Sequence, residues 1–241
     1  MESNTPNYVY DNVTQLNDAD ASRKYLAKVF TWMFIALGVS AFTAFEFFST
    51  PNLLALIISP TGFTALGYVA IFSPLAFSMV INFGFNRISY TGMVAIFIAY
   101  AVAIGITLSI FGLIYTGASI FTVFISASVV FGIMAIAGYT THQDLSQFGS
   151  ILRVVFFGAF AVMLINFFMH SAQIDYILSF VFVALMIGLT AYYMQMLKRI
   201  GAGIEYGTEE SKKLVIIGAF VLYTTFINLF MMMLRIFGRR R

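Results

Sequence analysis

The sequence predicts an all-α membrane protein, folded as a seven-transmembrane helix bundle. Hydrophobic residues make up 61% of the 241 positions and charged residues only 10%, whereas an ordinary soluble domain carries about 25% charge. The apolar residues fall into seven long stretches, and a helix needs about 20 mainly apolar residues to cross a bilayer. Only helices or closed barrels satisfy their backbone groups in lipid. The stretches are too long for barrel strands and lack their alternation, so helices are predicted.

Short loops separate the seven predicted spans. The spans cover residues 29–48, 63–83, 90–114, 118–139, 151–169, 176–197 and 214–237. We expect a flexible cytoplasmic tail over residues 1–23, because this part is polar and rich in Asn and Asp. One seven-helix domain then covers residues 24–238, and a short basic tail covers residues 239–241.

Basic residues gather on one side of the predicted membrane. Those before the first span or in even-numbered loops are Arg23, Lys24, Lys28, Arg87, Arg153, Lys198, Arg199, Lys212 and Lys213. The opposite short loops, residues 49–62, 115–117 and 170–175, contain no Lys or Arg. Because cytoplasmic loops carry an excess of basic residues, the N-terminus is predicted to be cytoplasmic.

The last span breaks this pattern. If residues 214–237 cross the membrane fully, Arg235 and the arginines at 239–241 lie outside, against the rule. A central helix forced across by tight packing would explain this, and a re-entrant segment that returns to the cytoplasm is the alternative. The apolar stretch is long enough to cross with some tilt, which favours the full crossing.

Small residues recur in the third and fourth spans. Ala101, Gly105 and Ser109 lie four positions apart, as do Ser128 and Gly132. Such spacing lets helix backbones approach closely, so we expect helix contacts at both faces. Lining of a pore is the alternative.

Acidic residues avoid the interior of every predicted span. None of the ten Asp and Glu residues lies near the middle of a stretch. An ionisable group inside a bilayer is the usual marker of an ion or proton pathway, so the chain lacks that marker.

Three blocks carry a family resemblance: GITLSIFGLIYT at 105–116, GYTTHQDL at 138–145 and LYTTFINLFMMMLRIFG at 222–238. With these blocks, residues 24–238 resemble the bacterial branch of the transmembrane Bax inhibitor-1 motif family. The resemblance implies seven helices with the last surrounded by the other six, and a bacterial inner-membrane location. It also implies a pH-sensitive calcium leak, and in eukaryotic relatives a role in suppressing cell death.

The family's pathway is attributed to two aspartates and an arginine. By resemblance, Tyr193 stands at the first aspartate position, Thr225 at the second, and Arg87 at the arginine position. A pair of buried carboxylates titrates as a unit and supplies oxygen ligands to Ca²⁺. Tyrosine, with a reference pKa of about 10, stays neutral, and threonine does not titrate. We therefore expect a calcium leak that is weak, altered or lost, although a Tyr–Thr hydrogen bond can still close the site. Arg87 is a gating contact by resemblance, or simply a surface arginine.

Other polar residues allow two interpretations each. Thr224 and Asn228 share a helical face and Asn166 lies within the fifth span; they form interhelical hydrogen bonds or line a residual path. Glu46, His170 and Asp175 are expected at the outer boundary. They form a mouth that attracts cations, or are separate surface groups.

The composition also restricts the class of function. No HExxH, nucleotide-binding loop or Gly-x-Ser-x-Gly element occurs, and the absence of cysteine excludes thiol catalysis. We expect no enzyme, no cofactor, no metal site and no nucleic-acid partner. The expected partners are the lipid bilayer and Ca²⁺ or another cation. The alternative is a non-conducting bundle that binds and regulates another membrane protein, such as a membrane-bound protease.

Overall fold

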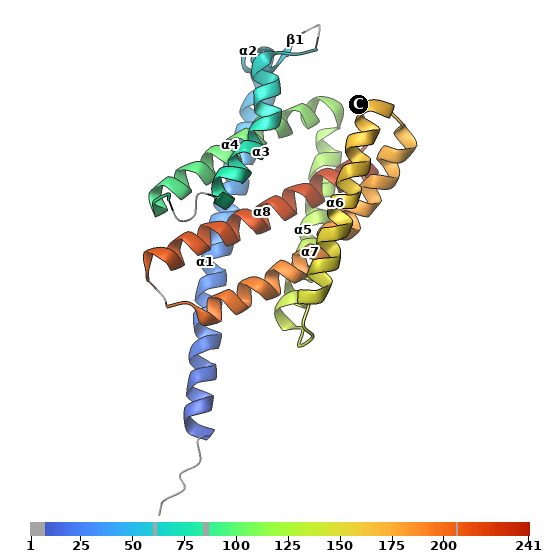
Figure 1. Ribbon diagram of the computed structural model, residues 1–241. Coiled ribbons are helices and arrows are strands. Elements are labelled where there is room, and N and C mark those ends of the chain that lie inside the picture. The colour runs from blue at the N-terminus through green and yellow to red at the C-terminus, as the bar shows by residue number, and fades with distance from the viewer. Residues whose placement is uncertain (1–7, 60–61, 84–86, 206) are drawn as a thin grey trace, which may run out of the picture.

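The computed structural model describes residues 8–59, 62–83, 87–205 and 207–241, which form eight α-helices and one small β-hairpin (Figure 1). The elements are α1 (Tyr8–Ser49), α2 (Pro51–Ile57), β1 (Ile58–Ser59), β2 (Gly62–Phe63), α3 (Ala65–Phe83), α4 (Tyr90–Ile114), α5 (Gly117–Thr140), α6 (Ser146–Met169), α7 (Ala172–Gly203) and α8 (Glu209–Phe237). Six of these described helices (α1 and α4–α8) are long and apolar enough to cross a membrane. The second predicted span coincides with α3, which has 19 residues. The all-α membrane bundle is thus confirmed, while the count of seven spans stays a prediction.

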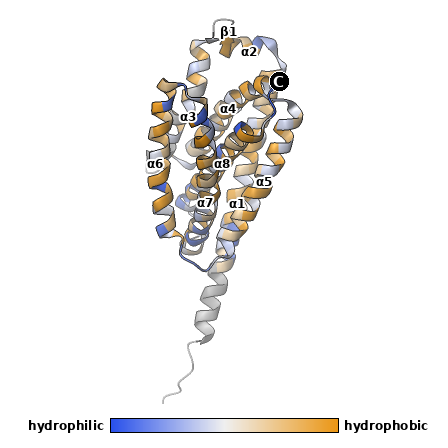
Figure 2. Ribbon diagram, turned by 90° about the vertical axis from the view of Figure 1, so that its right-hand side faces the viewer, coloured by the Kyte–Doolittle hydropathy of each residue, from blue (hydrophilic) through white to orange (hydrophobic). Residues whose placement is uncertain are grey.

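The exterior of the bundle is strongly apolar. Figure 2 shows hydrophobic residues covering the outward faces of α5 and α6. Large side chains such as Phe121 on α5 and Phe157 on α6 are 67% and 68% exposed. Apolar surface on this scale does not face water in a monomeric soluble protein, so these faces indicate contact with lipid.

The helix α8 lies at the centre of the bundle. Of its most apolar stretch 67% is buried, against 17% for α6. It packs mainly against α1, α4, α5 and α7, whereas α3 packs on α4 and α6 packs on α7 (Figure 1). The expected central position of the last helix is therefore confirmed. Four helices, rather than six, are its principal neighbours, because α3 and α6 form an outer layer.

The helix α8 also runs from one end of the bundle to the other without interruption. Its 29 residues correspond to about 44 Å at 1.5 Å per residue. Beyond its C-terminus, the Thr116 N–H donates to the Arg239 carbonyl at 3.1 Å and the Arg241 N–H donates to the Ile114 carbonyl at 3.0 Å. The basic tail is thus attached to the turn between α4 and α5. This straight course, with the tail at the opposite end from the start of α8, favours the full crossing over the re-entrant alternative.

The bundle has two distinct ends. The near end contains the loop between α5 and α6 and the loop between α7 and α8, and from it the N-terminal part of α1 projects (Figure 1). The far end contains the turns between α4 and α5 and between α6 and α7, the hairpin, and the C-terminal tail. The positive-inside pattern predicts that the near end is cytoplasmic.

The first helix differs from its prediction in length. α1 begins at Tyr8, so residues 8–23, expected to form a flexible tail, are helical. This segment contains neither proline nor glycine, and extending a helix that is already nucleated is far easier than starting one. Residues 1–7 lie outside the described residues.

Close helix contacts occur at one of the two predicted faces. A Cβ added to Gly105 would lie 2.7 Å from the Ser40 carbonyl oxygen on α1, so α1 and α4 meet there as predicted. At Gly132 no described atom lies within 4 Å of such a Cβ, and the predicted contact at this position is wrong. In α5 it is Gly138 that allows a close approach, because a Cβ there would overlap the backbone of Ala191 on α7.

Candidate functional site

The two positions expected to carry the pathway lie on α7 and α8, which pack against each other. Thr225 on α8 is only 4% exposed, and its hydroxyl donates to the Val221 carbonyl of the same helix at 2.8 Å. Tyr193 on α7 is half-buried. No hydrogen bond joins Tyr193 to Thr225 among the described residues, so the expected Tyr–Thr closure is not formed. Thr225 is satisfied within its own helix.

None of the acidic residues whose side chains the structure describes lies in the core. Those on the surface are Asp20, Asp144, Asp175, Glu205, Glu209 and Glu210. Glu46, near the far end of α1, is half-buried. Nor do three or more His, Asp or Glu side chains of the described residues gather into a group that could hold a metal ion.

Arg87, the third position given by the resemblance, is not joined to Tyr193 or Thr225 by a hydrogen bond or ion pair among the described residues. It is exposed in the turn between α3 and α4, and no hydrogen bond or ion pair involving its side chain occurs among the described residues. A gating contact from Arg87 to Tyr193 or Thr225 is therefore not observed. The exposed position agrees with a surface arginine at the near end.

The buried polar cluster of the bundle lies instead between α1, α4 and α8. The Ser40 hydroxyl lies 2.7 Å from the Ala101 carbonyl oxygen and 2.6 Å from the Tyr223 hydroxyl. A serine hydroxyl has a single proton, which Ser40 donates to a backbone carbonyl, so Tyr223 donates to Ser40. Next in sequence to Ala101 and Tyr223, the Tyr100 and Thr224 hydroxyls are 3.2 Å apart, which is the interhelical hydrogen bond expected of Thr224. This cluster connects three helices, and every member is neutral.

Asn228, by contrast, makes no side-chain hydrogen bond among the described residues, although it is half-buried on α8. Its expected interhelical hydrogen bond is therefore not observed. Three cavities in the described part of the chain are lined without Asn228, and they give a lining role no support.

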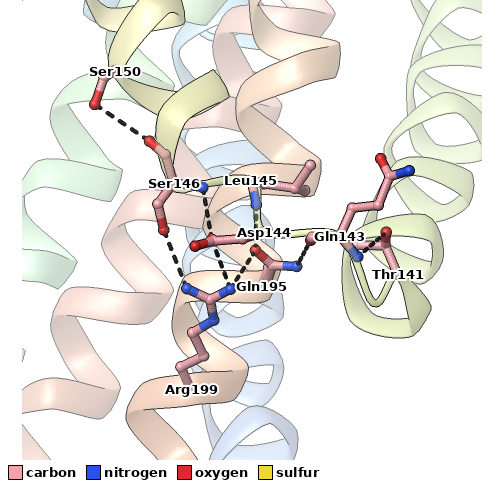
Figure 3. A network of polar contacts seen from close by, with 8 residues as sticks. All are labelled: Thr141, Gln143, Asp144, Leu145, Ser146, Ser150, Gln195 and Arg199. Carbon is pink, nitrogen blue, oxygen red and sulfur yellow. Dashed lines mark hydrogen bonds and ion pairs between the residues drawn. The ribbon is translucent and has the colours of Figure 1, made fainter.

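A second polar network fixes the near end of the bundle (Figure 3). The Gln195 side chain on α7 accepts from the Leu145 N–H at 2.9 Å and donates to the Gln143 carbonyl at 2.7 Å. One turn further on, Arg199 donates to the Asp144 carboxylate at 2.8 Å and to the Ser146 hydroxyl at 3.1 Å. We call this set, Gln195 and Arg199 with residues 143–146, the α5–α6 latch, because it binds that loop to α7.

The negative charge of Asp144 in the latch is stabilised by its neighbours. Hydrogen bonds from Ser146, and after them the Arg199 guanidinium, lower the pKa of Asp144 to about 2. Beside the latch, the Lys198 ammonium donates to the Tyr139 carbonyl at 2.8 Å in the last turn of α5, where a cation is favoured by the helix dipole. Sequence reasoning overlooked this network. One feature of the sequence could have indicated the network, because a group of polar residues ends the otherwise apolar span in α7.

Comparison with known proteins agrees with this architecture. The family model described as "Inhibitor of apoptosis-promoting Bax1" matches residues 22–241. The chain belongs to the Bax inhibitor-1 family. It is 36% identical over 218 residues to the inner membrane protein YbhL of Escherichia coli, covering 90% of this chain and 92% of that protein. It is 34% identical to an uncharacterized protein of Rickettsia prowazekii over 91% of both chains. An uncharacterized membrane protein of Streptococcus pyogenes is 29% identical over 95% of this chain and 98% of its own length.

In this Bax inhibitor-1 family member, the expected outer mouth is not assembled as a group. The Asn166 amide, 3% exposed, donates to the Asp175 carboxylate at 2.9 Å and bonds both backbone groups of Ser171. Asn166 thus fixes the turn between α6 and α7, and its bond to Asp175 is the interhelical hydrogen bond expected of it.

The remaining far-end candidates are engaged separately. Asp175 lies 3.9 Å from the Arg235 guanidinium, which offsets its negative charge. His170 is exposed and takes a left-handed conformation, with φ 55°, where α6 ends. Among the described residues, no hydrogen bond or ion pair joins Glu46 to His170 or Asp175. These side chains act at the far end as turn and surface groups.

Proposed function

We propose that this chain is a Bax inhibitor-1 family protein of the bacterial inner membrane whose pH-sensitive calcium leak is weak, altered or lost. The observation that carries this proposal is Thr225, a buried residue whose hydroxyl is satisfied by its own helix. By resemblance, it stands where the family has one of its two aspartates. The other position holds Tyr193.

The physical basis is the absence of a titrating pair. Two carboxylates in one site share protons and change charge together with pH, and their oxygens are the ligands that Ca²⁺ requires. Neither Tyr193 nor Thr225 ionises near neutral pH, because tyrosine has a reference pKa of about 10 and threonine has no ionisable group. The acidic side chains that the structure describes lie on the surface or, for Glu46, near it, which supports a core without a toggling charge.

The proposed location rests on two supports. The relative from Escherichia coli is named an inner membrane protein. The basic residues of the near end favour a cytoplasmic N-terminus. We further propose that the chain is not an enzyme, since the sequence contains no HExxH, nucleotide-binding loop or Gly-x-Ser-x-Gly element.

The test is calcium flux through purified protein in liposomes that contain a calcium dye. The chain itself should give little flux, with no dependence on pH around neutrality. The double variant Tyr193→Asp with Thr225→Asp should gain a flux that changes with pH, because it restores the carboxylate pair.

The matched control is Tyr193→Asn with Thr225→Asn, which introduces polar groups of similar size without charge and should stay inactive. A pH-dependent flux through the unaltered chain would overturn the proposal. If neither the chain nor the aspartate variant conducts, the alternative of a non-conducting bundle that binds another membrane protein gains support.

A further inference from the structure

The bundle has an apolar groove between α1 and α5. Two adjoining cavities, of about 410 and 870 Å³, open along these helices and share the lining residues Leu37, Ala41 and Phe124. The shared residues show that the two cavities adjoin end to end along α1 and α5, and we call the pair the α1–α5 groove. Its floor is the central helix, through Phe226, Ile227, Phe230 and Leu234 of α8.

Small side chains keep this groove open. Gly38 and Ala44 line it on α1, and Gly132 and Ala135 line it on α5. Gly132 has no described atom within 4 Å of a Cβ position, so the repeat of small residues in α5 creates space rather than a helix contact. A slender apolar chain is the shape that fits between such walls.

The groove has the length of a membrane. Its lining on α1 extends from Arg23 to Phe48, which is about 38 Å along a helix. A bilayer has a hydrocarbon core of about 30 Å, and about 40–45 Å including the headgroup regions. The two ends of the groove therefore lie at the level of lipid headgroups.

An arginine stands at each end, and the two differ in their partners. Arg23 lies 3.8 Å from the Asp20 carboxylate. Arg241 lines the far end, with its guanidinium 5.4 Å from the centre of the Phe48 ring, and no acidic group of the described residues forms an ion pair with it. The backbone bond from Arg241 to the Ile114 carbonyl holds it there. The far end of the groove thus carries a guanidinium whose backbone is anchored, which stacks near the Phe48 ring, and which forms no ion pair with an acidic side chain of the described residues.

We propose that the α1–α5 groove binds one acyl chain of an anionic phospholipid, whose phosphate is held by Arg241. The apolar walls accept the chain, and the guanidinium forms strong hydrogen bonds with phosphate oxygens. An anionic lipid is favoured over a zwitterionic one because its headgroup has no ammonium to oppose the arginine. The site also gives a reason for basic residues at the end of the bundle where the positive-inside rule disfavours them.

The experiment measures quenching of a single tryptophan by lipids with brominated chains, in bilayer nanodiscs of phosphatidylcholine. The natural tryptophan is removed by Trp32→Phe, and Phe45→Trp then places a reporter on the groove wall. Brominated phosphatidylglycerol should quench this reporter at a several-fold lower mole fraction than brominated phosphatidylcholine. The matched control, Phe157→Trp on the exposed face of α6, should be quenched equally by both lipids.

Two further variants test the parts of the site. Arg241→Ala, which leaves the backbone bonds of the tail in place, should reduce the preference for phosphatidylglycerol to the control value, whereas Arg240→Ala, outside the groove lining, should retain it. Ala41→Phe, at the junction of the two cavities, should reduce quenching by either lipid. Equal quenching by the two lipids at Phe45→Trp would overturn the proposal, as would an unchanged preference in Arg241→Ala.

Discussion

At the level of single residues, Ser40, Tyr223 and Thr225 show how polar groups are accommodated inside this bundle. Each is buried, and each hydroxyl has a hydrogen-bond partner on its own helix or a neighbouring one. No buried side-chain nitrogen or oxygen of the described residues lacks a partner. Since an unsatisfied polar group is costly in an apolar interior, these bonds are needed for the bundle to close, and no charge is required.

The Tyr223 hydroxyl gives the first prediction. Tyr223→Phe should lower stability by about 0.6 kcal/mol, and by at most about 1.7 kcal/mol, the measured range for hydrogen bonds between membrane helices. Ser40 would retain its backbone acceptors, which limits the loss. Unfolding of the purified protein in detergent measures the effect. Tyr176→Phe, at an exposed position, is the control and should change nothing.

The latch gives a prediction about pH. The pKa of Asp144 is lowered from 3.8 to about 2. A carboxylate whose pKa is lowered by folding contributes stability above its ordinary pKa and loses it as the pH falls through the lower value. The Leu145 amide should therefore keep the same hydrogen-exchange protection factor from neutral pH down to about pH 4, where Asp144 is still ionised. The variant Asp144→Asn, which cannot ionise at this position, is the reference. A fall in the protection of the Leu145 amide between neutral and mildly acidic pH would contradict the lowered pKa of Asp144.

At the level of elements, the sequence predicts the helices that are strongly apolar. It does not predict the helical extension of a polar segment or the hydrogen bonds that polar side chains form. Each predicted span lies within or closely overlaps a helix, because a long apolar stretch has no other stable form in lipid. The extension of α1 from Tyr8 was missed, since a polar segment does not reveal whether it continues a helix. The latch was missed because hydrogen bonds from Gln195 and Arg199 depend on which loop lies beside them.

The spacing of small residues was predictive at one face only. Gly105 gives a close contact while Gly132 gives a groove, although both belong to repeats of four. Spacing defines which residues share a face of a helix, but the neighbour that the face meets is decided by the whole bundle.

These two glycines form a matched pair for mutation. Gly105→Leu should destabilise the protein by about 1–3 kcal/mol, the usual cost of forcing extra volume into a packed interior, because its side chain would displace α1 at Ser40. Gly132→Leu adds the same volume into open space and should be tolerated. Thermal unfolding in detergent compares the two, and equal effects would show that the contact between α1 and α4 is not tight.

At the level of the whole molecule, one apolar helix at the centre organises the rest. α8 is surrounded mainly by α1, α4, α5 and α7, and its C-terminal tail is bonded to the turn between α4 and α5. Its central position was implied by the family resemblance and not by the composition, since all the spans are similarly apolar. The resemblance identified which residues stand at the site positions. It did not predict their hydrogen bonds, because those depend on tertiary packing.

The orientation of the molecule can be measured directly, because the chain has no cysteine. His142→Cys at the near end and Ala172→Cys at the far end are both exposed and each provides a unique thiol. In intact cells, a membrane-impermeant maleimide should label Ala172→Cys and should label His142→Cys only after the membrane is opened. The reverse pattern would show that the N-terminus is outside.

The decisive measurement is calcium flux through the unaltered chain in dye-loaded liposomes, compared between mildly acidic and mildly alkaline buffer. We expect the same low flux on both sides of neutrality, close to that of liposomes without protein, because no acidic side chain that the structure describes lies in the core to change its charge in that range. A clear rise or fall of flux across neutral pH would contradict this expectation.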